Sequence, residues 1–361
     1  MRIELPISKS IANRLLILQA IHGDGLLSVS DSMPDDVRIM SEAIRLLGER
    51  REARIDLGNC GTAMRFLTAY CAQLEGQTTI LDGVERMHHR PIGQLVDALH
   101  EIGADIEYLG EEGFPPLRIK GKALDKSKPI TLNTPQSTQF VSALLLIGAN
   151  VQTDSTSPYI SITREIIDQY SHYFKILNSK FIIEKDWSSA AFWYEYVALH
   201  GGEITLPGLS RDSLQGDKIV ADIFAHLGVH TTYTAEGIIL SPIAYSEASY
   251  SPLSGRPIAA QAESHSKILV QDFGNCPDLY PAVALTCERL GVELHATGVE
   301  SLPLKESDRL RAVSEHRTDA DHRMAMALLI AGYEVDDTAC ISKSYPQFLE
   351  QFHRINTLKL Q

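Results

Sequence analysis

Cysteine and long apolar runs are scarce in this chain of 361 residues. Its five cysteines are an odd number, and no two of them stand in C-x-x-C spacing. This pattern indicates free thiols in a reducing compartment and argues against a zinc cage. No apolar run approaches the roughly eighteen residues of a membrane span, and the N-terminus lacks the basic-then-apolar layout of a secretory signal. We therefore expect a cytoplasmic protein without a membrane partner.

Positive charge is also in deficit. Lysine and arginine together number 33 against 46 acidic residues, which gives a formal net charge of −13. Nucleic acids bind to broad basic surfaces, so this balance argues against a nucleic-acid partner. The 13 histidines match no ligand spacing such as H-E-x-x-H, and we expect no catalytic metal. Any anion that the protein binds must therefore be held by a local cluster of cations.

What the chain does contain is a repeated pattern of polar helix starts. A composition of 44% hydrophobic and 22% charged residues is that of a globular protein, and the length allows two domains. Six stretches place a polar or charged start before a run that is apolar on nearly every side, as in helices buried within a domain. They are residues 5–21, 61–67, 137–145, 188–193, 277–283 and 322–328.

The spacing of these six starts predicts an α/β architecture built by duplication. Amphipathic helices are expected at 35–48, 91–102 and 217–227, and strands or hairpins at 26–30, 78–81, 103–119, 203–206, 228–240 and 292–295. The starts fall into two groups of three. We therefore predict two lobes, at 9–184 and 185–361, with residues 1–8 joining the second. Six helix N-termini would then face a common cleft.

Hydrogen-bond donors gather at or near the six helix starts. The free N–H groups and the positive dipole end of a helix attract anions, and lysine or arginine there strengthens the effect. The cations are Lys9, Arg14, Arg86, Lys305, Arg309, Arg323 and Lys343, and the hydroxyl and amide donors are Ser10, Asn59, Thr62, Ser137, Thr138 and Gln139. So many donors fit more than one phosphate or carboxylate. The ligand is therefore expected to be strongly anionic.

Two carboxylates, Asp278 and Glu306, belong to this cationic set. General acid–base catalysis or contact with a substrate hydroxyl would explain their presence. The alternative is that each carboxylate only neutralises a neighbouring arginine. Spacing alone leaves both interpretations open.

The motifs and their order resemble the 5-enolpyruvylshikimate-3-phosphate (EPSP) synthase family. The likeness spans essentially the whole chain. It is carried by Leu5-Pro6-Ile7-Ser8-Lys9-Ser10 with Asn13-Arg14, Gly61-Thr62-Ala63-Met64-Arg65, Arg86-Met87 with Arg90-Pro91-Ile92-Gly93, Ser137-Thr138-Gln139-Phe140, Ser157-Pro158-Tyr159-Ile160, Pro277-Asp278, Lys305-Glu306-Ser307-Asp308-Arg309 and Asp321-His322-Arg323-Met324-Ala325-Met326.

The resemblance implies a two-lobed inside-out α/β barrel, each lobe built from three repeats of a β/α folding unit. It implies transfer of the enolpyruvyl group of phosphoenolpyruvate to the 5-hydroxyl of shikimate 3-phosphate, through a tetrahedral ketal intermediate and with release of phosphate. This reaction belongs to the shikimate pathway, which leads to chorismate and the aromatic amino acids. The resemblance further implies a monomer without metal or organic cofactor, and inhibition by glyphosate, for which Gly61 leaves room.

The resemblance also assigns roles to individual residues. Proton transfer falls to Asp278, Glu306 and Lys9. Shikimate 3-phosphate would be held by Lys9, Ser10, Arg14, Ser137, Thr138, Gln139, Thr156, Asp278 and Lys305. Phosphoenolpyruvate would be held by Lys9, Gly61, Arg86, Gln139, Arg309, Arg323 and Lys343.

The chain departs from the family pattern in two places. The stretch between Arg309 and His322 and the stretch between Leu146 and Tyr159 are shorter than usual. These shortenings keep open an inactive, anion-binding homologue. A second alternative is the sister enzyme UDP-N-acetylglucosamine enolpyruvyl transferase, although the loop at 82–90 lacks the reactive cysteine of that family.

Overall fold

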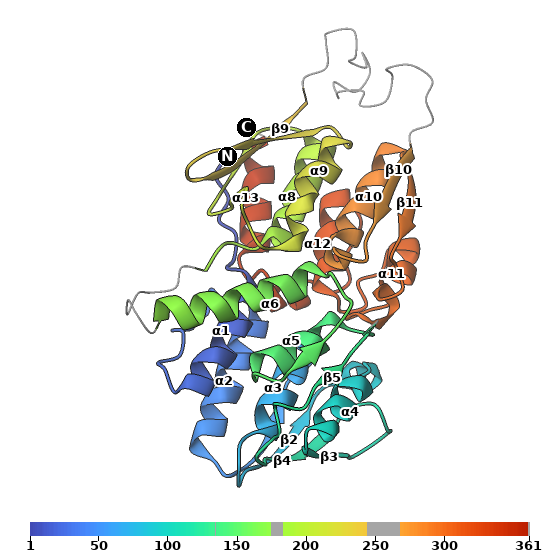
Figure 1. Cartoon of the computed structure of the whole chain (residues 1–361). Coiled ribbons are helices and arrows are strands. Elements are labelled where there is room, and N and C mark those ends of the chain that lie inside the picture. The colour runs from blue at the N-terminus through green and yellow to red at the C-terminus, as the bar shows by residue number, and fades with distance from the viewer. Residues whose placement is uncertain (134, 175–182, 244–267, 360–361) are drawn as a thin grey trace. The chain divides into compact units, whose positions relative to one another are not determined.

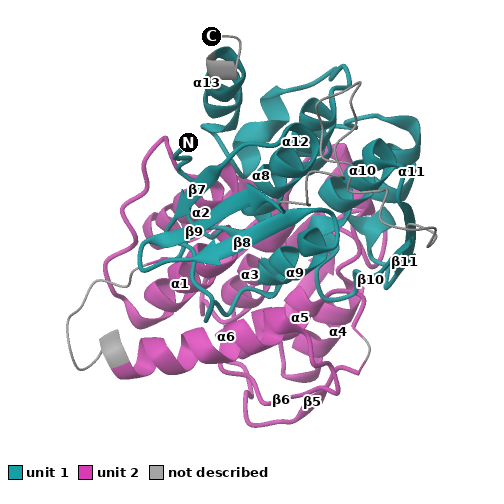
Figure 2. Cartoon of the chain, turned by 90° about the horizontal axis from the view of Figure 1, so that it is seen from above, with its two compact units in different colours: residues 1–8, 184–361 teal, residues 9–183 magenta. Residues whose placement is uncertain are grey.

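The computed structural model describes residues 1–133, 135–174, 183–243 and 268–359 (Figure 1). The chain divides into two compact units, which Figure 2 shows in different colours. One unit consists of residues 9–183, and the other of residues 1–8 together with 184–361. Among the described residues, no helix combines the length and apolar character needed to cross a membrane.

Three helices with predicted polar starts form the centre of the unit at 9–183. They are α1 (Lys9–His22), α3 (Gly61–Ala72) and α5 (Thr138–Leu146). Each is buried over most of its length, and the three pack against one another. A helix that is apolar on nearly every side is stable only when other elements cover it. The three predictions of buried helices are therefore confirmed.

A four-stranded sheet of order β1-β2-β4-β3 belongs to the same unit. β1 (Glu52–Asp56) runs parallel to β2 (Thr78–Asp82), and β4 (Leu117–Lys120) is antiparallel to both β2 and β3 (Asp105–Tyr108). The β3–β4 pair confirms the predicted hairpin. The remaining elements are α2 (Asp35–Glu49), η1 (Glu85–His89), α4 (Gly93–Glu101), β5 (Ile130–Thr131), β6 (Val151–Gln152), α6 (Pro158–Gln169) and η2 (Tyr170–Phe174).

The other unit repeats the arrangement of three buried helices. α8 (Trp187–His200), α10 (Tyr280–Leu290) and α12 (His322–Ala331) pack together in its core. Asp186 caps α8 by accepting the N–H groups of Ser188 and Ser189. The N-terminal residues extend a sheet here, since Ile3 N donates to Thr205 O at 3.0 Å.

Two small sheets accompany these helices. β7 (Ile204–Pro207), β9 (Gly237–Pro242) and β8 (Val229–Tyr233) are antiparallel neighbours in that order, while β10 (Ile268–Asp272) and β11 (Glu293–Thr297) form a parallel pair. The other elements are η3 (Gly216–Ile219), α9 (Val220–Ala225), η5 (Pro277–Leu279), η6 (Leu302–Leu304), α11 (Arg309–Glu315), η7 (Ala339–Lys343) and α13 (Phe348–Lys359).

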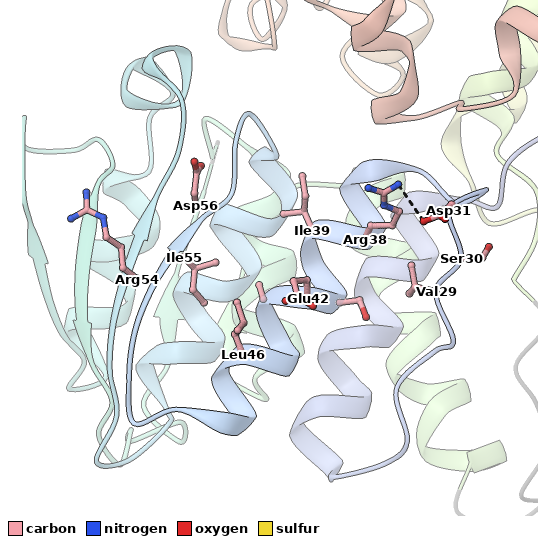
Figure 3. A pocket seen from close by; sticks show the side chains of 12 residues that line it. Val29, Ser30, Asp31, Arg38, Ile39, Glu42, Leu46, Arg54, Ile55 and Asp56 are labelled. Carbon is pink, nitrogen blue, oxygen red and sulfur yellow. Dashed lines mark ion pairs between the residues drawn. The ribbon is translucent and has the colours of Figure 1, made fainter.

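The strand predicted at residues 26–30 is wrong. These residues have no regular structure, and none of them is fully buried. A groove of about 610 Å³ is lined by residues 29–31, by α2 and by residues 54–56 of β1, which is the edge strand of its sheet (Figure 3). An alternating sequence forms a strand only where a partner strand completes its hydrogen bonds. None of the residues that the structure describes pairs with residues 26–30 as a strand, so the alternation alone was misleading.

Candidate active site

Arg309 is the centre of a buried ion-pair network in the unit of residues 1–8 and 184–361. Its side chain is 1% exposed. Nη1 contacts Asp278 Oδ1 at 2.8 Å, Nη2 contacts Glu306 Oε2 at 3.0 Å, and Nε contacts Asp321 Oδ2 at 2.8 Å. Burial works to lower the pKa of Arg309, but the three carboxylates outweigh it and raise the pKa above its ordinary value. The guanidinium is therefore permanently charged.

Asp278 connects Arg309 to a second buried arginine. Arg323 Nη2 contacts Asp278 Oδ2 at 2.7 Å, and the Arg323 side chain is also 1% exposed. Nη1 and Nε of Arg323 are buried and meet no hydrogen-bond acceptor in the part of the chain that the structure describes. Leaving a buried donor without an acceptor costs about 1–3 kcal/mol. Arg323 is therefore suited to bind a further acceptor, and its charge favours an anion.

Glu306 extends the network to a lysine. Lys343 Nζ, at the end of η7, contacts Glu306 Oε1 at 3.0 Å, and both side chains are largely buried. We call the six residues Asp278, Glu306, Arg309, Asp321, Arg323 and Lys343 the Arg309 cluster. It contains three cations and three carboxylates, so its charges balance when all six are ionised.

Helix starts place the side chains of the Arg309 cluster. Asp308 caps α11 by accepting the N–H of Arg311 at 3.2 Å, and Asp321 caps α12 by accepting the N–H of Arg323 at 2.9 Å. Asp, with its short acceptor side chain, is among the preferred residues at this position. Each cap therefore fixes the first turn of its helix, from which Arg309 on α11 and Arg323 on α12 reach Asp278.

Gly61 lies against two arginine side chains in the unit at 9–183. A Cβ atom at Gly61 would lie 2.6 Å from Arg90 Nη2 and closer still to Arg65 Nη1. Only glycine therefore leaves both guanidinium groups where they are. Arg90 is held by Asn59, whose backbone and side-chain oxygens accept from Nη1 at 3.1 Å and 3.2 Å.

Gln139 connects this arginine pair to α5. Arg65 Nη1 donates to Gln139 Oε1 at 3.1 Å, and Gln139 Nε2 donates to Thr62 Oγ1 at 2.9 Å. We call Asn59, Gly61, Thr62, Arg65, Arg90 and Gln139 the Gly61 cluster. These bonds join the two guanidinium groups to neutral oxygens. Such a cluster favours an anionic ligand.

The two cations at the start of α1 have different surroundings. Lys9 Nζ contacts Asp36 Oδ2 at 3.0 Å, with side-chain exposures of 13% and 4%. Arg14 is buried and donates to Ser10 O and to Thr163 Oγ1, both at 2.7 Å. Burial lowers the pKa of Arg14 to about 10. Arg14 thus holds the first turn of α1 against α6.

The other predicted site residues lie at helix ends and turns. Ser137 caps α5 by accepting the N–H of Gln139 at 3.3 Å, and Thr138 is the first residue of that helix. Thr156 is exposed just before α6, and Lys305 is half-buried between η6 and α11. Arg86 is half-buried on η1, whereas the side-chain atoms nearest to Gly61 belong to Arg65 and Arg90.

Three residues of the two clusters, Arg65, Arg90 and Asp321, were absent from the predicted site, as was Asp36, the partner of Lys9. Arg65 stands four residues after Gly61, on the same face of α3, which is a signal that the sequence contains. Arg90 precedes the Pro91-Ile92-Gly93 motif. Asp36 and Asp321 carried no comparable signal, because only the fold shows that they face Lys9 and Arg309. Among the described residues, no group of three or more His, Cys, Asp or Glu side chains is arranged to hold a metal ion.

Fold and site together define an α/β protein of two units with arginine-rich clusters at helix starts. The family model of EPSP synthase (3-phosphoshikimate 1-carboxyvinyltransferase) matches residues 1–318 and 313–352. This chain therefore belongs to the EPSP synthase family.

Individual relatives agree with this assignment. The 3-phosphoshikimate 1-carboxyvinyltransferase of Bacteroides fragilis strain YCH46 is 37% identical, with 96% of this chain and 93% of the relative covered. The enzyme of that name from Colwellia psychrerythraea is 29% identical over 98% of this chain and 96% of the relative. A solved structure of EPSP synthase from Acinetobacter baumannii has a TM-score of 0.63 at 19% identity, covering 98% of this chain and 95% of that one. This last likeness concerns the fold.

The match to the Bacteroides relative extends over 407 aligned positions, although the whole chain has 361 residues. The relative therefore contains internal segments that this chain lacks. The short stretches noted between Arg309 and His322 and between Leu146 and Tyr159 are consistent with that difference.

Proposed function

We propose that this protein transfers the enolpyruvyl group of phosphoenolpyruvate to the 5-hydroxyl of shikimate 3-phosphate and releases phosphate. Family membership supports this reaction over transfer to UDP-N-acetylglucosamine. The observation that carries the proposal within the molecule is the pairing of Asp278 with Arg323, whose buried Nη1 and Nε have no acceptor among the described residues. A carboxylate thus contacts an arginine that has two further buried donors, which supports binding of an anionic substrate beside it.

The reaction has two steps that both require proton transfer. The oxygen of the 5-hydroxyl attacks C2 of phosphoenolpyruvate, the hydroxyl proton leaves to a base, and C3 receives a proton. The ketal then expels phosphate while C3 gives a proton back. Asp278, Glu306 and Lys9 are the proposed proton carriers. The two carboxylates contact Arg309, Arg323 and Lys343, and neighbouring cations favour the charged form that a base requires.

The two substrates divide the donors between them. Shikimate 3-phosphate is assigned to Lys9, Ser10, Arg14, Ser137, Thr138, Gln139, Thr156, Asp278 and Lys305, and phosphoenolpyruvate to Lys9, Gly61, Arg86, Gln139, Arg309, Arg323 and Lys343. To the second set we add Arg65 and Arg90, because both guanidinium groups lie against Gly61. Cations around the phosphate stabilise the charge that develops on the leaving group.

The architecture of the family supports this assignment of residues to the two substrates. We propose that the units of residues 9–183 and of 1–8 with 184–361 are the two lobes of an inside-out α/β barrel, each with three copies of a β/α folding unit. In this proposal α1, α3 and α5 belong to the three copies of one lobe, and α8, α10 and α12 to those of the other. The internal segments that the chain lacks would shorten individual copies without removing a buried helix.

Phosphate release from phosphoenolpyruvate tests the proposed function. Release is expected with shikimate 3-phosphate as acceptor, and no release with UDP-N-acetylglucosamine. Release only with the nucleotide sugar would identify the sister activity. Binding of shikimate 3-phosphate without any release would identify an inactive homologue.

A further inference from the structure

β1 is an edge strand of the four-stranded sheet in the unit of residues 9–183. Backbone hydrogen bonds alternate between the two sides of a strand, and the odd-numbered residues bond towards β2, as Leu57 N does to Asp82 O at 2.9 Å. The backbone groups of residues 52, 54 and 56 face the other side. They meet no backbone partner in the part of the chain that the structure describes. Such an edge is a template for a further strand.

The groove described above lies beside this edge. Residues 54–56 line it together with Ile39 and Leu46 of α2, which are both half-buried. Figure 3 shows Ile55 on the side of β1 that faces α2, and Arg54 pointing away from it. Alternate side chains of an added strand would therefore lie towards the apolar residues of α2. The groove supplies both space and apolar contact for such a strand.

The opposite face of the same edge carries charges of alternating sign. Arg50, Glu52, Arg54 and Asp56 are all exposed, and Arg50 already has an extended backbone. Arg54 Nη2 contacts Asp82 Oδ2 at 2.6 Å, but the Arg54 side chain is 67% exposed and keeps further donors accessible. The other three charged side chains form no ion pair with any described residue. The row can therefore pair with charges on another strand.

The charges of this row are complementary to those of a second copy of the same strand. Antiparallel pairing about a two-fold axis at Ala53 places Glu52 opposite the second copy's Arg54. It also places Arg50 opposite the second copy's Asp56. The symmetry repeats both pairs, so four pairs of opposite charge form. Moving the axis to Glu52 or to Arg54 would place like charges opposite each other, which destabilises a sheet.

We propose that β1 pairs with β1 of a second copy of this chain, which makes the protein a two-fold symmetric dimer. The two sheets join into one sheet of eight strands, four from each copy. Pairing gives partners to the edge backbone groups of both copies and covers Ile39 and Leu46 in each groove. The dimer differs from the monomer that the family resemblance implies, and it does not depend on the proposed reaction.

Sedimentation velocity of the whole chain, from nanomolar to high micromolar concentration, tests the proposal. The wild type should change from monomer to dimer as its concentration rises. Arg54→Glu and Glu52→Arg each turn two pairs of opposite charge into pairs of like charge, so each should raise the dimer Kd by about tenfold or more. A wild type that stays monomeric at every concentration would overturn the proposal.

Lys120→Glu is the matched control. It also reverses an exposed charge on a strand of this sheet, but β4 is an inner strand, so the dimer Kd should equal that of the wild type. Added salt should weaken the wild-type dimer, because the four charge pairs lie at an exposed face. A dimer that both edge substitutions leave unchanged would use a different surface, and this result would also overturn the proposal.

Mixing the two edge variants gives the most specific test. Arg54→Glu and Glu52→Arg should each be monomeric alone, whereas an equal mixture should form a heterodimer in which every central pair is again of opposite charge. The double variant Glu52→Arg/Arg54→Glu should dimerise like the wild type, which also decides the matter if one single variant does not fold. A mixture and a double variant that both stay monomeric would overturn the proposed register.

Discussion

The Gly61 cluster and the Arg309 cluster use buried arginine in opposite ways. In the first, Arg65 and Arg90 donate to amide and carbonyl oxygens, which are neutral. In the second, Arg309 alone contacts three carboxylates within 3.0 Å. Bonds to neutral oxygens do not offset the charge of a cation, whereas the ion pairs of the Arg309 cluster do. In the proposed reaction both clusters supply cations for phosphoenolpyruvate, and the Arg309 cluster adds two of the carboxylates and amines proposed to move protons, Asp278 and Glu306.

Removal of the central cation of the balanced cluster should have the largest effect. Arg309→Met leaves Asp278, Glu306 and Asp321 without their shared partner, and breaking such a buried network costs about 3–5 kcal/mol of unfolding free energy. Urea unfolding measures this loss. Part of the stability should return as the pH falls, because the orphaned carboxylates then take up protons.

The matched control for that substitution lies two residues further along α11. Arg311 pairs with Glu315 at the surface, with side-chain exposures of 63% and 41%, so Arg311→Met should leave unfolding almost unchanged. Equal losses for Arg309→Met and Arg311→Met would show that the Arg309 cluster is not an energetic unit.

Disturbance of the positive cluster should affect substrate binding more than stability. Gly61→Ala places a methyl group where the guanidinium groups of Arg65 and Arg90 lie, so both must shift. We expect KM for phosphoenolpyruvate to rise by about tenfold or more, the equivalent of one displaced charged hydrogen bond. Inhibition by glyphosate, expected from the family resemblance, can be measured in the same phosphate-release assay.

Gly48→Ala is the control for this substitution. It also lies in a helix, but a Cβ there meets nothing within 4 Å. Its KM should equal that of the wild type, and its helix should be slightly more stable. A Gly61→Ala protein with unchanged KM would separate the Gly61 cluster from the substrate.

The extreme case in this comparison of buried charged groups is a carboxyl group in an apolar core. Glu195 on α8 is 0% exposed, and neither oxygen meets a hydrogen-bond partner among the described residues. Burial raises its pKa well above the ordinary value, so the folded protein keeps a proton that the unfolded chain loses above about pH 4.3. The wild type therefore loses up to about 1.4 kcal/mol of stability per pH unit as the pH rises towards the folded pKa.

Glu195→Gln removes this loss. At low pH its effect should be smaller than the effects of Arg309→Met and Gly61→Ala. Its gain in unfolding free energy over the wild type should grow between pH 5 and pH 8. Glu350→Gln, at an exposed position of α13, should show no such growth. A constant difference across the pH range would mean that Glu195 is ionised in the folded protein.

The buried helices were predictable because each is apolar on nearly every side, so no other environment suits it. Asp35 to Gly48 was equally readable as an amphipathic helix, and α2 confirms it. Short strands could not be predicted in the same way. β1, with the sequence Glu-Ala-Arg-Ile-Asp, buries only Ile55 fully, and β10 was not expected at all. Strands of five residues depend on partners that are distant in the sequence.

The clusters were only partly predictable for the same reason. Arg86 and Arg90 lie four residues apart in one motif, and the sequence offers no basis for choosing between them. The fold places Arg90 beside Gly61 through its bonds to Asn59. Asp217 on η3 belongs to none of the motifs that carry the family resemblance. Only the packing of η3 on α8 brings it to Ser188. Local sequence predicts helix starts, while the partners of each charge depend on the tertiary fold.

The most direct test of the proposed residue roles is one steady-state experiment on two variants, Asp278→Asn and Arg90→Met. Phosphoenolpyruvate is varied at saturating shikimate 3-phosphate. Loss of a general base should lower kcat of Asp278→Asn by about 10²–10⁴-fold. Loss of an anion-binding guanidinium should raise KM of Arg90→Met by about tenfold or more with a smaller change in kcat. The reverse pattern, with kcat lost in Arg90→Met and only KM changed in Asp278→Asn, would contradict the proposed roles of Arg90 in binding and of Asp278 in proton transfer.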